Sequence, residues 1–415
     1  MGPVPKALGT GPNWKVYISG CWAFKEGKAQ DDFFDLYPEL IEYKEKIEIL
    51  WEDPEGPHSV SPNRREEKKI SFDKISPLLQ KIGARGEVWL YTKKFVLIQW
   101  GCDSFCSFCL TVKKRWRHYY RAKEDIAEEI EKFSQSWWKE VVLTWINLCA
   151  WWLKSTNPKP PSNSPLCKEG GQFVVEKFEE VESRFAELLE YLLENTSIKR
   201  LRISSIWPEF VDEKLLKIFE NKRIYPHFHF SVQSGSTKNL NNMKRHYTAS
   251  FLKNILLKLR SIKREDWVKI SIWADIIVGF PWETEEDFQK TLDLVSDCKI
   301  TKVHAFPFSA HKLWENVPAW FYKEQISDKV KKERMNRILK LADKVREDFI
   351  KENIWNTFEI LVEQTHPKPL PSKEGGVNWK GWTQNYIEAN QDNIEVISWK
   401  IKRNDIIIGK LIRSL

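Results

Sequence analysis

The chain has 415 residues, of which 42% are hydrophobic and 30% charged, with a formal net charge of +8. At about 100–200 residues per domain this length predicts two to four domains, and the apolar content excludes disorder as the main state. The longest apolar stretch, 141–153, is interrupted by Thr144 and Asn147, so no membrane span is expected. Because residues 1–14 lack an apolar signal segment, we expect a cytoplasmic protein.

Between residues 94 and 309, short β-branched segments alternate with amphipathic helical segments. The predicted strands are Phe95–Gln99, Val141–Ile146, Arg200–Ser205, His227–Gln233, Lys269–Val278 and Lys302–Phe308. The predicted helices lie near 123–135, 176–194, 211–220, 248–263 and 284–296. Six such alternations predict an α/β domain with a parallel sheet, open or closed, whose functional residues lie at the carboxyl ends of the strands.

Further segments flank this α/β region. Residues 1–60 have the pattern of a small α/β piece, and a charged helix is predicted over 326–352. The last segment alternates apolar and polar residues and predicts a small β-barrel. We therefore expect four parts, with bounds 1–85, 86–325, 326–355 and 356–415.

Two stretches rich in Pro, Ser and Gly interrupt this order, at Asn157–Gly171 and His366–Gly376. They share Pro-Lys-Pro followed by Lys-Glu-Gly-Gly, and such a composition favours surface loops. We interpret both as tolerated insertions without a function. Deleting both should leave folding and activity intact, and loss of either would contradict this interpretation.

Three of the seven cysteines fall within eight residues: Cys102, Cys106 and Cys109 form a C-x3-C-x2-C run directly after a predicted strand. In a cytosolic chain, clustered cysteines indicate metal or redox chemistry. A loop this tight can present three thiolates to one [4Fe–4S] cluster and leave the fourth iron open. Structural zinc would need a fourth ligand, and the separation of His118 matches no usual zinc finger.

This cysteine spacing resembles the signature of the radical S-adenosylmethionine (SAM) superfamily. Further segments resemble the tRNA methylthiotransferases, and the last of them is similar to the start of the RNA-binding TRAM domain. These segments are 95–121, 226–247, 275–287, 306–309 and 381–386. The form of 228–235 looks most like the branch that acts on threonylcarbamoyladenosine beside the anticodon. The implied fold is a partial (β/α)6 TIM-like barrel between an N-terminal α/β remnant and a C-terminal TRAM β-barrel.

The resemblance also implies the chemistry. The cluster held by Cys102, Cys106 and Cys109 would cleave SAM, and the resulting 5′-deoxyadenosyl radical would abstract hydrogen from C2 of the modified adenosine. A second [4Fe–4S] cluster would donate sulfur, and a second SAM would methylate it. We therefore expect a monomeric radical SAM methylthiotransferase. Its expected partners are the tRNA anticodon stem-loop and an electron donor of the flavodoxin or ferredoxin type.

Five residues at or near the predicted strand ends would line the SAM site by this resemblance. They are Thr144, Ser204, Gln233, Asp275 and Gly279. Each alone has an alternative role in closing a strand end or capping a helix. Thr284, followed by acidic residues as far as Asp287, predicts a helix capping box.

Two basic groups are candidates for RNA contact. Lys113, Lys114, Arg115 and Arg117 are interleaved with aromatic residues after the cysteine loop, a combination that suits phosphates and unpaired bases. Lys400, Lys402 and Arg403 would form a basic edge of the last barrel. The alternatives are a solvated charged face and a small barrel without RNA.

The chain departs from the family in its first part. The second cluster needs three further cysteines, and only Cys21 matches one of those positions. We therefore expect SAM binding without a complete sulfur-inserting cluster, the result of an N-terminally truncated gene model. The alternative functions are methylthiolation of a ribosomal protein and RNA binding without catalysis. Iron near four per chain, together with SAM cleavage, would exclude the non-catalytic alternative.

The chain contains 21 Trp but only 17 Gly, whereas the usual glycine share of about 7% would give roughly 29. Many tryptophans stand where the family pattern has glycine: Trp22, Trp116, Trp137, Trp138, Trp145, Trp273, Trp282, Trp314 and Trp355. We hypothesise that most of these codons are UGA and that the organism reads them as glycine. Finding UGG at Trp116, Trp145 and Trp282 would contradict this hypothesis.

Overall fold

The computed structural model describes about two thirds of the sequence in detail. The described residues are 4–8, 15–19, 24–25, 28–29, 47–49, 92–102, 104–111, 119–135, 138–144, 148, 151, 184–309, 317–367, 377–396 and 401–414. The chain divides into two compact units, residues 1–90 and 91–415. Among the described helices, none combines the length and the apolar character that crossing a membrane requires.

The first unit contains a small mixed sheet. Strand β1 (Val4–Leu8) pairs antiparallel with β2 (Lys15–Ser19), and β2 pairs in parallel with β5 (Ile47–Ile49). Strands β3 (Phe24–Lys25) and β4 (Lys28–Ala29) form a short hairpin. Cys21 lies outside the described residues, so its expected role as a cluster ligand remains a prediction.

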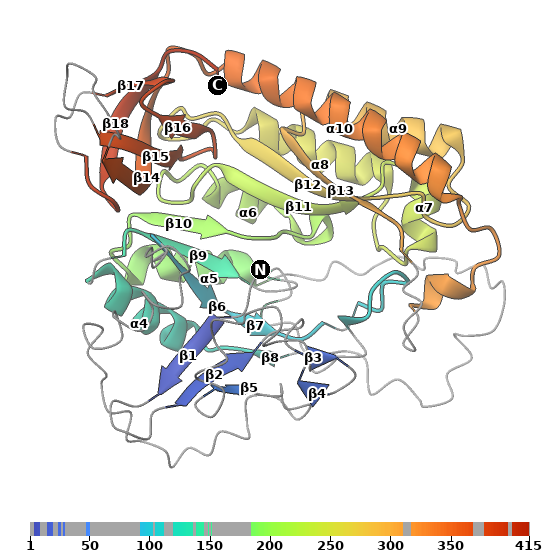
Figure 1. Cartoon of the computed structure of the whole chain (residues 1–415), viewed down its shortest axis with the longest axis horizontal. Coiled ribbons are helices and arrows are strands. Elements are labelled where there is room, and N and C mark those ends of the chain that lie inside the picture. Colours follow the sequence, from blue (N-terminus) through green and yellow to red (C-terminus); the bar gives the residue numbers. More distant parts are fainter. Residues whose placement is uncertain are drawn as a thin grey trace. The chain divides into compact units, whose positions relative to one another are not determined.

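The second unit is built on six parallel strands (Figure 1). They pair as two sheets of three, in the orders β10-β9-β6 and β11-β12-β13. Isolated parallel bridges, Leu201 with Ile224 and Ile206 with Phe230, connect the β10 side to the β11 side. The strands are β6 (Lys93–Leu97), β9 (Glu140–Thr144), β10 (Arg200–Ile203), β11 (His227–Gln233), β12 (Ser271–Val278) and β13 (Lys302–Pro307). The predicted parallel α/β architecture is thereby confirmed.

Helices follow these strands. They are α4 (Lys123–Ser134), α5 (Phe185–Asn195), α6 (Glu213–Ile218), α7 (Thr237–Asn242), α8 (Ala249–Ser261), α9 (Glu285–Asp297) and α10 (Asp328–Lys351). Among the α-helices that the structure describes, α7 is the one that the sequence pattern missed, because most of its residues are polar and have low helix propensity. Its start is instead fixed by Ser236, whose side chain accepts a hydrogen bond from the backbone of Asn239.

The helices pack through the faces that their periodicity predicts. On α5, Phe185, Leu188, Leu189 and Leu192 are fully buried and join one core with the inward residues of the strands. Helix α10 lies along β12 and β13 (Figure 1). This packing fixes the strand ends on which the candidate site is built.

The last part of the chain is a five-stranded antiparallel sheet in the order β16-β15-β14-β18-β17. It has its own core, which includes Phe358, Ile360, Val362 and Trp379. In the described ladders β16 and β17 are the two edges, so closure into a barrel remains a prediction. The strands are β14 (Thr357–Pro367), β15 (Val377–Thr383), β16 (Glu388–Asn390), β17 (Ile394–Val396) and β18 (Ile406–Leu411).

A buried charge network centres on Glu140, at the start of β9. Its carboxylate accepts hydrogen bonds from Arg200 Nε at 2.9 Å and Arg202 Nε at 2.8 Å, and all three side chains are inaccessible or nearly so. Burial would raise the pKa of Glu140, but Arg202, Lys93 and Arg200 outweigh it and hold the pKa well below its usual range. The carboxylate is therefore ionised inside the protein.

This network, which we call the Glu140 network, also reaches the last sheet. Lys93 lies 2.6 Å from Glu363 on β14, and Arg202 donates a hydrogen bond to the carbonyl of Gln384. The guanidinium of Arg202 also lies 4.4 Å from the centre of the Tyr386 ring. The six-stranded region and the last sheet are therefore joined by buried, charged contacts.

Backbone conformation bears on the tryptophan hypothesis. Nine described residues other than glycine have positive φ, and three of them are tryptophans: Trp267 (59°), Trp282 (64°) and Trp355 (75°). The left-handed region of backbone conformation, where φ is positive, is strained for a residue that has a Cβ, whereas glycine adopts it readily. Two of the three, Trp282 and Trp355, are positions where glycine was expected. Trp273 is a buried strand residue without positive φ, and its indole nitrogen has no hydrogen-bond partner.

We expect Trp355→Gly to stabilise the protein by about 1 kcal/mol, because it removes the cost of the left-handed conformation. The side chain of Trp355 is 64% exposed, so little buried apolar surface is lost. Trp151 is the control, since it is 2% exposed and donates a hydrogen bond from its indole to the Arg121 carbonyl. Urea unfolding should show Trp151→Gly to be strongly destabilising. A destabilising Trp355→Gly would contradict the strain argument.

Candidate functional site

The three clustered cysteines lie on a loop that follows β7 (Gln99–Trp100). Positive φ at Gly101 (77°) and Phe105 (49°) turns the chain tightly, and the Cys109 amide donates to the Cys106 carbonyl at 3.1 Å. Cys102 and Cys106 are buried, and Cys109 is half-buried. The loop therefore gathers the three thiols.

Ser107 attaches this loop to the end of α7. The Ser107 amide donates to the Met243 carbonyl at 3.1 Å, and its hydroxyl donates to the Asn242 carbonyl at 2.7 Å. The Ser107 carbonyl accepts from the Ala319 amide at 2.8 Å, and Ser107 is fully buried. The cysteines are thus held by residues more than 130 positions away in the sequence.

The surroundings of the thiols suit a positively charged metal centre. Burial raises the pKa of the Cys106 thiol against the opposing effect of Arg245, and with the smaller contributions of Cys102 and Cys109 the pKa is about 11. Three adjacent thiolates need a cation to be stable, and iron bound by them keeps them deprotonated. Three sulfur donors on one loop match the ligands that protein [4Fe–4S] clusters use. The residues therefore fit such a cluster.

The sequence patterns did not single out Arg245. Its Nη1 lies 3.6 Å from Cys106 Sγ, and its guanidinium lies 3.8 Å from the centre of the Trp207 ring. Glu209 is 3.6 Å from its Nη2. Because Arg245 is 139 residues from Cys106, only the folded chain brings the two together.

Four of the five predicted SAM-site residues lie at one end of the parallel strands. Thr144 and Gln233 are the last residues of β9 and β11, while Ser204 and Gly279 follow β10 and β12. Gln233 is buried and has φ of 64°, and Gly279 has φ of 70°. Parallel strands place such residues at one edge, where sites of this architecture form. Their contact with SAM remains a prediction.

The fifth predicted residue, Asp275, also lies near a strand end, and its contact with SAM likewise remains a prediction. Asp275 lies within β12, three residues before the strand ends at Val278, as the predicted bounds of this strand imply. Its Oδ1 lies 2.8 Å from His229 Nε2 and 3.4 Å from His304 Nδ1. Burial would raise the pKa of Asp275, but the two histidines lower it to about 2. These three side chains could hold a divalent metal, since their ligand atoms lie within 4.8 Å of one another.

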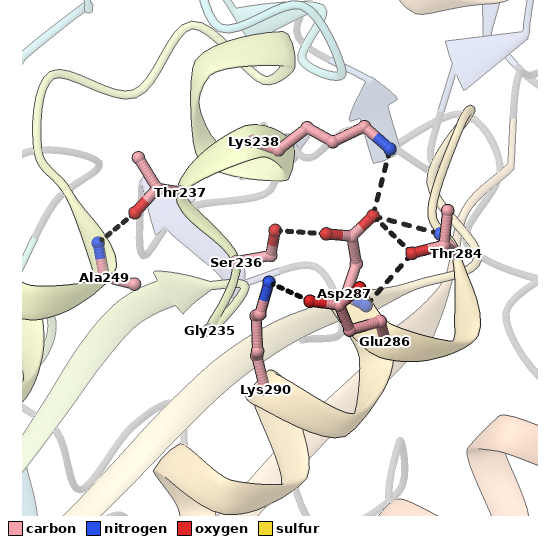
Figure 2. A pocket seen from close by; sticks show the side chains of 9 residues that line it. All are labelled: Gly235, Ser236, Thr237, Lys238, Ala249, Thr284, Glu286, Asp287 and Lys290. Carbon is pink, nitrogen blue, oxygen red and sulfur yellow. Dashed lines mark hydrogen bonds and ion pairs between the residues drawn. The ribbon is translucent and has the colours of Figure 1, made fainter.

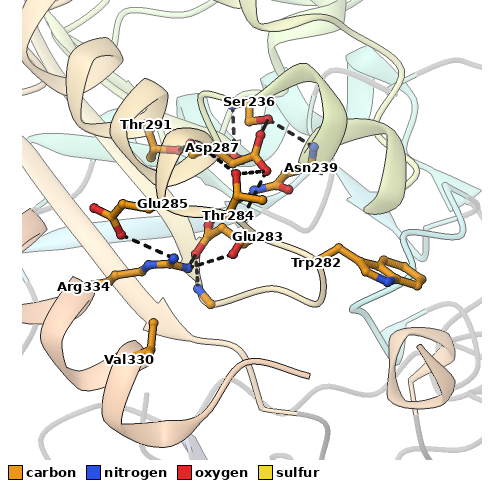
Figure 3. Close-up of polar contacts among 12 residues, drawn as sticks. Ser236, Asn239, Trp282, Glu283, Thr284, Glu285, Asp287, Thr291, Val330 and Arg334 are labelled. Atoms are coloured by element: carbon orange, nitrogen blue, oxygen red, sulfur yellow. Dashed lines mark hydrogen bonds and ion pairs between the residues drawn. The ribbon is translucent and has the colours of Figure 1, made fainter. Parts of the chain in front are cut away.

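The turn after β12 is held by Glu283 (Figure 3). Its Oε2 accepts from the Gly279 amide at 2.7 Å and from Arg334 Nη1 at 2.8 Å. Burial raises the pKa of Glu283 to about 7, while these two donors oppose the rise. The Trp282 side chain points away from this cluster in Figure 3, and its ring lies 4.6 Å from that of Tyr322, centre to centre.

A pocket of about 420 Å³ lies between the start of α9 and the segment after β11 (Figure 2). Thr284 and Asp287 form the predicted capping box, which is confirmed. Asp287 also accepts hydrogen bonds from Ser236 at 2.7 Å and Lys238 at 3.1 Å. Burial would raise the pKa of Asp287, but these donors, with Thr284, lower it to about 2.

This lowered pKa predicts a pH dependence. A carboxylate with a folded-state pKa below its ordinary 3.8 stabilises the protein above pH 3.8, and this stability is lost as pH falls toward 2. We expect Asp287 to contribute about 2 kcal/mol to the difference in unfolding free energy between pH 5 and pH 2. Asp287→Asn should show a correspondingly flatter pH profile in chemical unfolding. An unchanged profile would contradict the role of these hydrogen bonds.

The comparisons with known proteins agree with this geometry. The model of the radical SAM superfamily matches residues 96–295. tRNA-2-methylthio-N(6)-dimethylallyladenosine synthase of Clostridium tetani is 28% identical over 399 residues, 94% of this chain and 79% of the relative. Threonylcarbamoyladenosine tRNA methylthiotransferase MtaB of Bacillus subtilis is 27% identical over 324 residues, 78% of this chain and 62% of the relative. The chain belongs to the radical SAM methylthiotransferase family.

Among solved structures, coproporphyrinogen III oxidase (HemN) from Escherichia coli, a radical SAM enzyme, is 12% identical. The likeness has a TM-score of 0.40 and covers 72% of this chain and 66% of that one. The methyltransferase TsrM from Kitasatospora setae gives a TM-score of 0.40 at 15% identity, covering 54% and 39%. At such low scores, the fold of this methylthiotransferase rests on its strand topology and on the matched family.

Most candidate RNA contacts of this methylthiotransferase lie outside the described residues. These are Lys113, Lys114, Arg115, Arg117 and Lys400. Of the remaining two, Lys402 is exposed and its amide donates to Asp405, while Arg403 is half-buried beside it before β18. The predicted basic edge is therefore described only in part, and its contact with RNA remains a prediction.

Proposed function

We propose that this chain is a methylthiotransferase that modifies C2 of a hypermodified adenosine beside the tRNA anticodon. The observation that carries the proposal is the docked loop of Cys102, Cys106 and Cys109 in a member of this family. Both relatives named above are tRNA-modifying enzymes by name. We also propose that the six parallel strands form the partial barrel of the superfamily and that the last sheet is the TRAM domain.

The residues of the chain divide the work between them. When bound by the three cysteines, a [4Fe–4S] cluster supplies the electron that cleaves SAM to a 5′-deoxyadenosyl radical. Ser107 holds the cysteine loop on the end of α7, and Thr144, Ser204, Gln233 and Gly279 would line the cofactor at the strand ends. Glu283 and Arg334 keep the turn after β12 closed, which fixes the backbone beside Gly279.

We propose the threonylcarbamoyl branch on the form of residues 228–235, which resembles that branch most. A threonylcarbamoyl group carries a carboxylate, whereas a dimethylallyl group is an uncharged hydrocarbon. The two substrates therefore differ in charge at the modified adenosine.

The test uses the anaerobically reconstituted chain with SAM, a reductant and tRNA. We expect iron near four per chain and formation of 5′-deoxyadenosine. A 2-methylthio product on tRNA that carries threonylcarbamoyladenosine is expected only where the second, sulfur-donating cluster is complete. Equal activity on tRNA with dimethylallyladenosine would contradict the choice of branch. A cluster without SAM cleavage would contradict an enzyme of this class. The methylthio product also reports on the second cluster, which we propose includes Cys21.

We expect the basic edge and the basic run to act differently on tRNA. Neutralising Lys400, Lys402 and Arg403 should weaken binding to all tRNAs alike and flatten its salt dependence, because phosphate contacts release counterions. Changing Arg115 and Arg117 should instead lower turnover. Filter binding at several salt concentrations and 5′-deoxyadenosine release measure the two effects. Normal tRNA binding by the first variant at moderate salt would remove the RNA role of the last domain.

A further inference from the structure

The buried Arg245 is the feature that the proposed function does not yet use. It is 3% exposed, and each of its side-chain nitrogens faces a defined partner. Nε donates to Tyr247 Oη at 3.2 Å and Nη2 donates to the Ser231 carbonyl at 3.3 Å. Nη1 lies 3.6 Å from Cys106 Sγ. The guanidinium therefore has a fixed orientation with one N–H directed at a cysteine of the trio.

The local backbone explains this orientation. At the end of α7, Lys244 adopts φ of 58°, and the Arg245 amide donates to the Leu240 carbonyl at 2.9 Å. A left-handed residue after a helix reverses the chain, which here sends Arg245 inward. The same helix end receives Ser107 of the cysteine loop through Asn242 and Met243. The carboxyl end of α7 thus positions both the cysteine loop and the guanidinium of Arg245.

The charge of Arg245 is available to the cysteines. Its nearest carboxylate is Glu209, whose Oε2 lies 3.6 Å from Nη2 and has no hydrogen-bond partner. Burial disfavours the ionised carboxylate of Glu209 and raises its pKa, against the opposing effect of Arg245. Trp207 lies against the guanidinium plane at 3.8 Å and excludes water from it. A cation in a buried site from which water is excluded interacts strongly with neighbouring charges, because the local dielectric constant is low.

We propose that Arg245 donates an N–H···S hydrogen bond to the Cys106 thiolate and thereby raises the reduction potential of the cluster that the trio holds. Each electron added to the cluster increases its negative charge, so a donor and a positive charge beside a ligand sulfur stabilise the reduced state. Hydrogen bonds to cluster sulfurs and burial are known determinants of such potentials. Arg245 is a positioning and tuning residue, because it acts through Cys106. The inference rests on the proposed function in one respect, that the trio binds a [4Fe–4S] cluster.

The test is a redox titration of reconstituted protein followed by electron paramagnetic resonance. We expect Arg245→Gln to keep iron near four per chain while the ratio of reduced to oxidised cluster at a fixed potential falls about tenfold, equivalent to about 59 mV for one electron. Lys244→Asn is the matched control, since it removes the same charge one position away and Asn tolerates positive φ. This control should leave the potential unchanged. A wild-type potential in Arg245→Gln would overturn the proposal.

A second measurement does not depend on the stability of a variant. Wild-type protein labelled with ¹⁵N only in its arginine side chains should show ¹⁵N coupling in pulsed electron paramagnetic resonance of the reduced cluster. The coupling should disappear in Arg245→Lys, and its absence from the wild type would overturn the hydrogen bond. Failure of the trio to bind iron in the wild type would instead contradict the proposed function, so the two failures are distinguishable.

Discussion

Glu140→Gln should lower the free energy of unfolding by about 3–5 kcal/mol, the usual cost of removing one partner from a buried ion pair. The substitution keeps the shape of the side chain but leaves Arg200 and Arg202 with uncompensated charges. Arg200 is fully buried, and its Nη1 and Nη2 already have no hydrogen-bond partner. Its Nε would therefore lose the one carboxylate that it contacts at 2.9 Å. Urea unfolding followed by circular dichroism measures the loss.

Glu363→Gln is the matched control for this prediction. Glu363 also pairs with Lys93, at 2.6 Å, but its side chain is 26% exposed, so water replaces part of the lost contact. We expect it to cost about 1 kcal/mol, as partly exposed ion pairs do. Equal losses in the two variants would show that the burial of Glu140 does not determine its contribution.

Cys106→Ala should abolish both stable cluster binding and SAM cleavage. Two thiolates cannot hold a cubane with one open iron, and the sequence from Cys102 to Cys109 contains no further cysteine that could replace Cys106. Iron content, the visible absorption of the reconstituted protein and release of 5′-deoxyadenosine measure the loss. We expect uncoupled SAM cleavage to fall to the level of the reaction without protein.

Cys298→Ala provides the control for this cysteine. Cys298 is a buried free thiol at the end of α9, and burial raises its pKa to about 11. It is remote in sequence from the trio and belongs to the main core. Its replacement should cost stability but retain iron near four per chain. If Cys106→Ala keeps its iron and its SAM cleavage, the assignment of the trio is wrong.

The sequence predicted what depends on local pattern. Residues His227–Gln233 form a strand with the expected bounds, because β-branched and aromatic residues there alternate within a buried sheet. The capping box at Thr284 was predictable because all its groups lie within four residues. The cysteine spacing likewise predicts a metal loop from eight residues alone. The left-handed backbone at Trp282 and Trp355 agrees with the expectation of glycine there.

The rest depends on contacts between distant segments. Nothing near Arg245 in the sequence indicates that it lies beside Cys106, because the approach is made by the reversal at the end of α7. The place of Asp275 near the end of β12 was predictable, but its contacts with His229 and His304 were not, because the two histidines lie on neighbouring strands. The Glu140 network combines charges from β9 and β10, which sequence patterns treat as separate elements.

The Glu140 network has a consequence for how far apart bound molecules can lie. Through Lys93 it fixes the last sheet to the amino end of β6, and Arg202 within β10 adds a second contact, whereas the cysteine loop follows the carboxyl end of β6 and the short strand β7. A rigid joint of this kind keeps a constant distance between the last sheet and the cysteine loop. If the last sheet binds RNA, only nucleotides at one fixed distance along the RNA from that binding point would therefore reach the cysteine loop. Selection of the modified position would then follow from length as well as from the chemistry of the base.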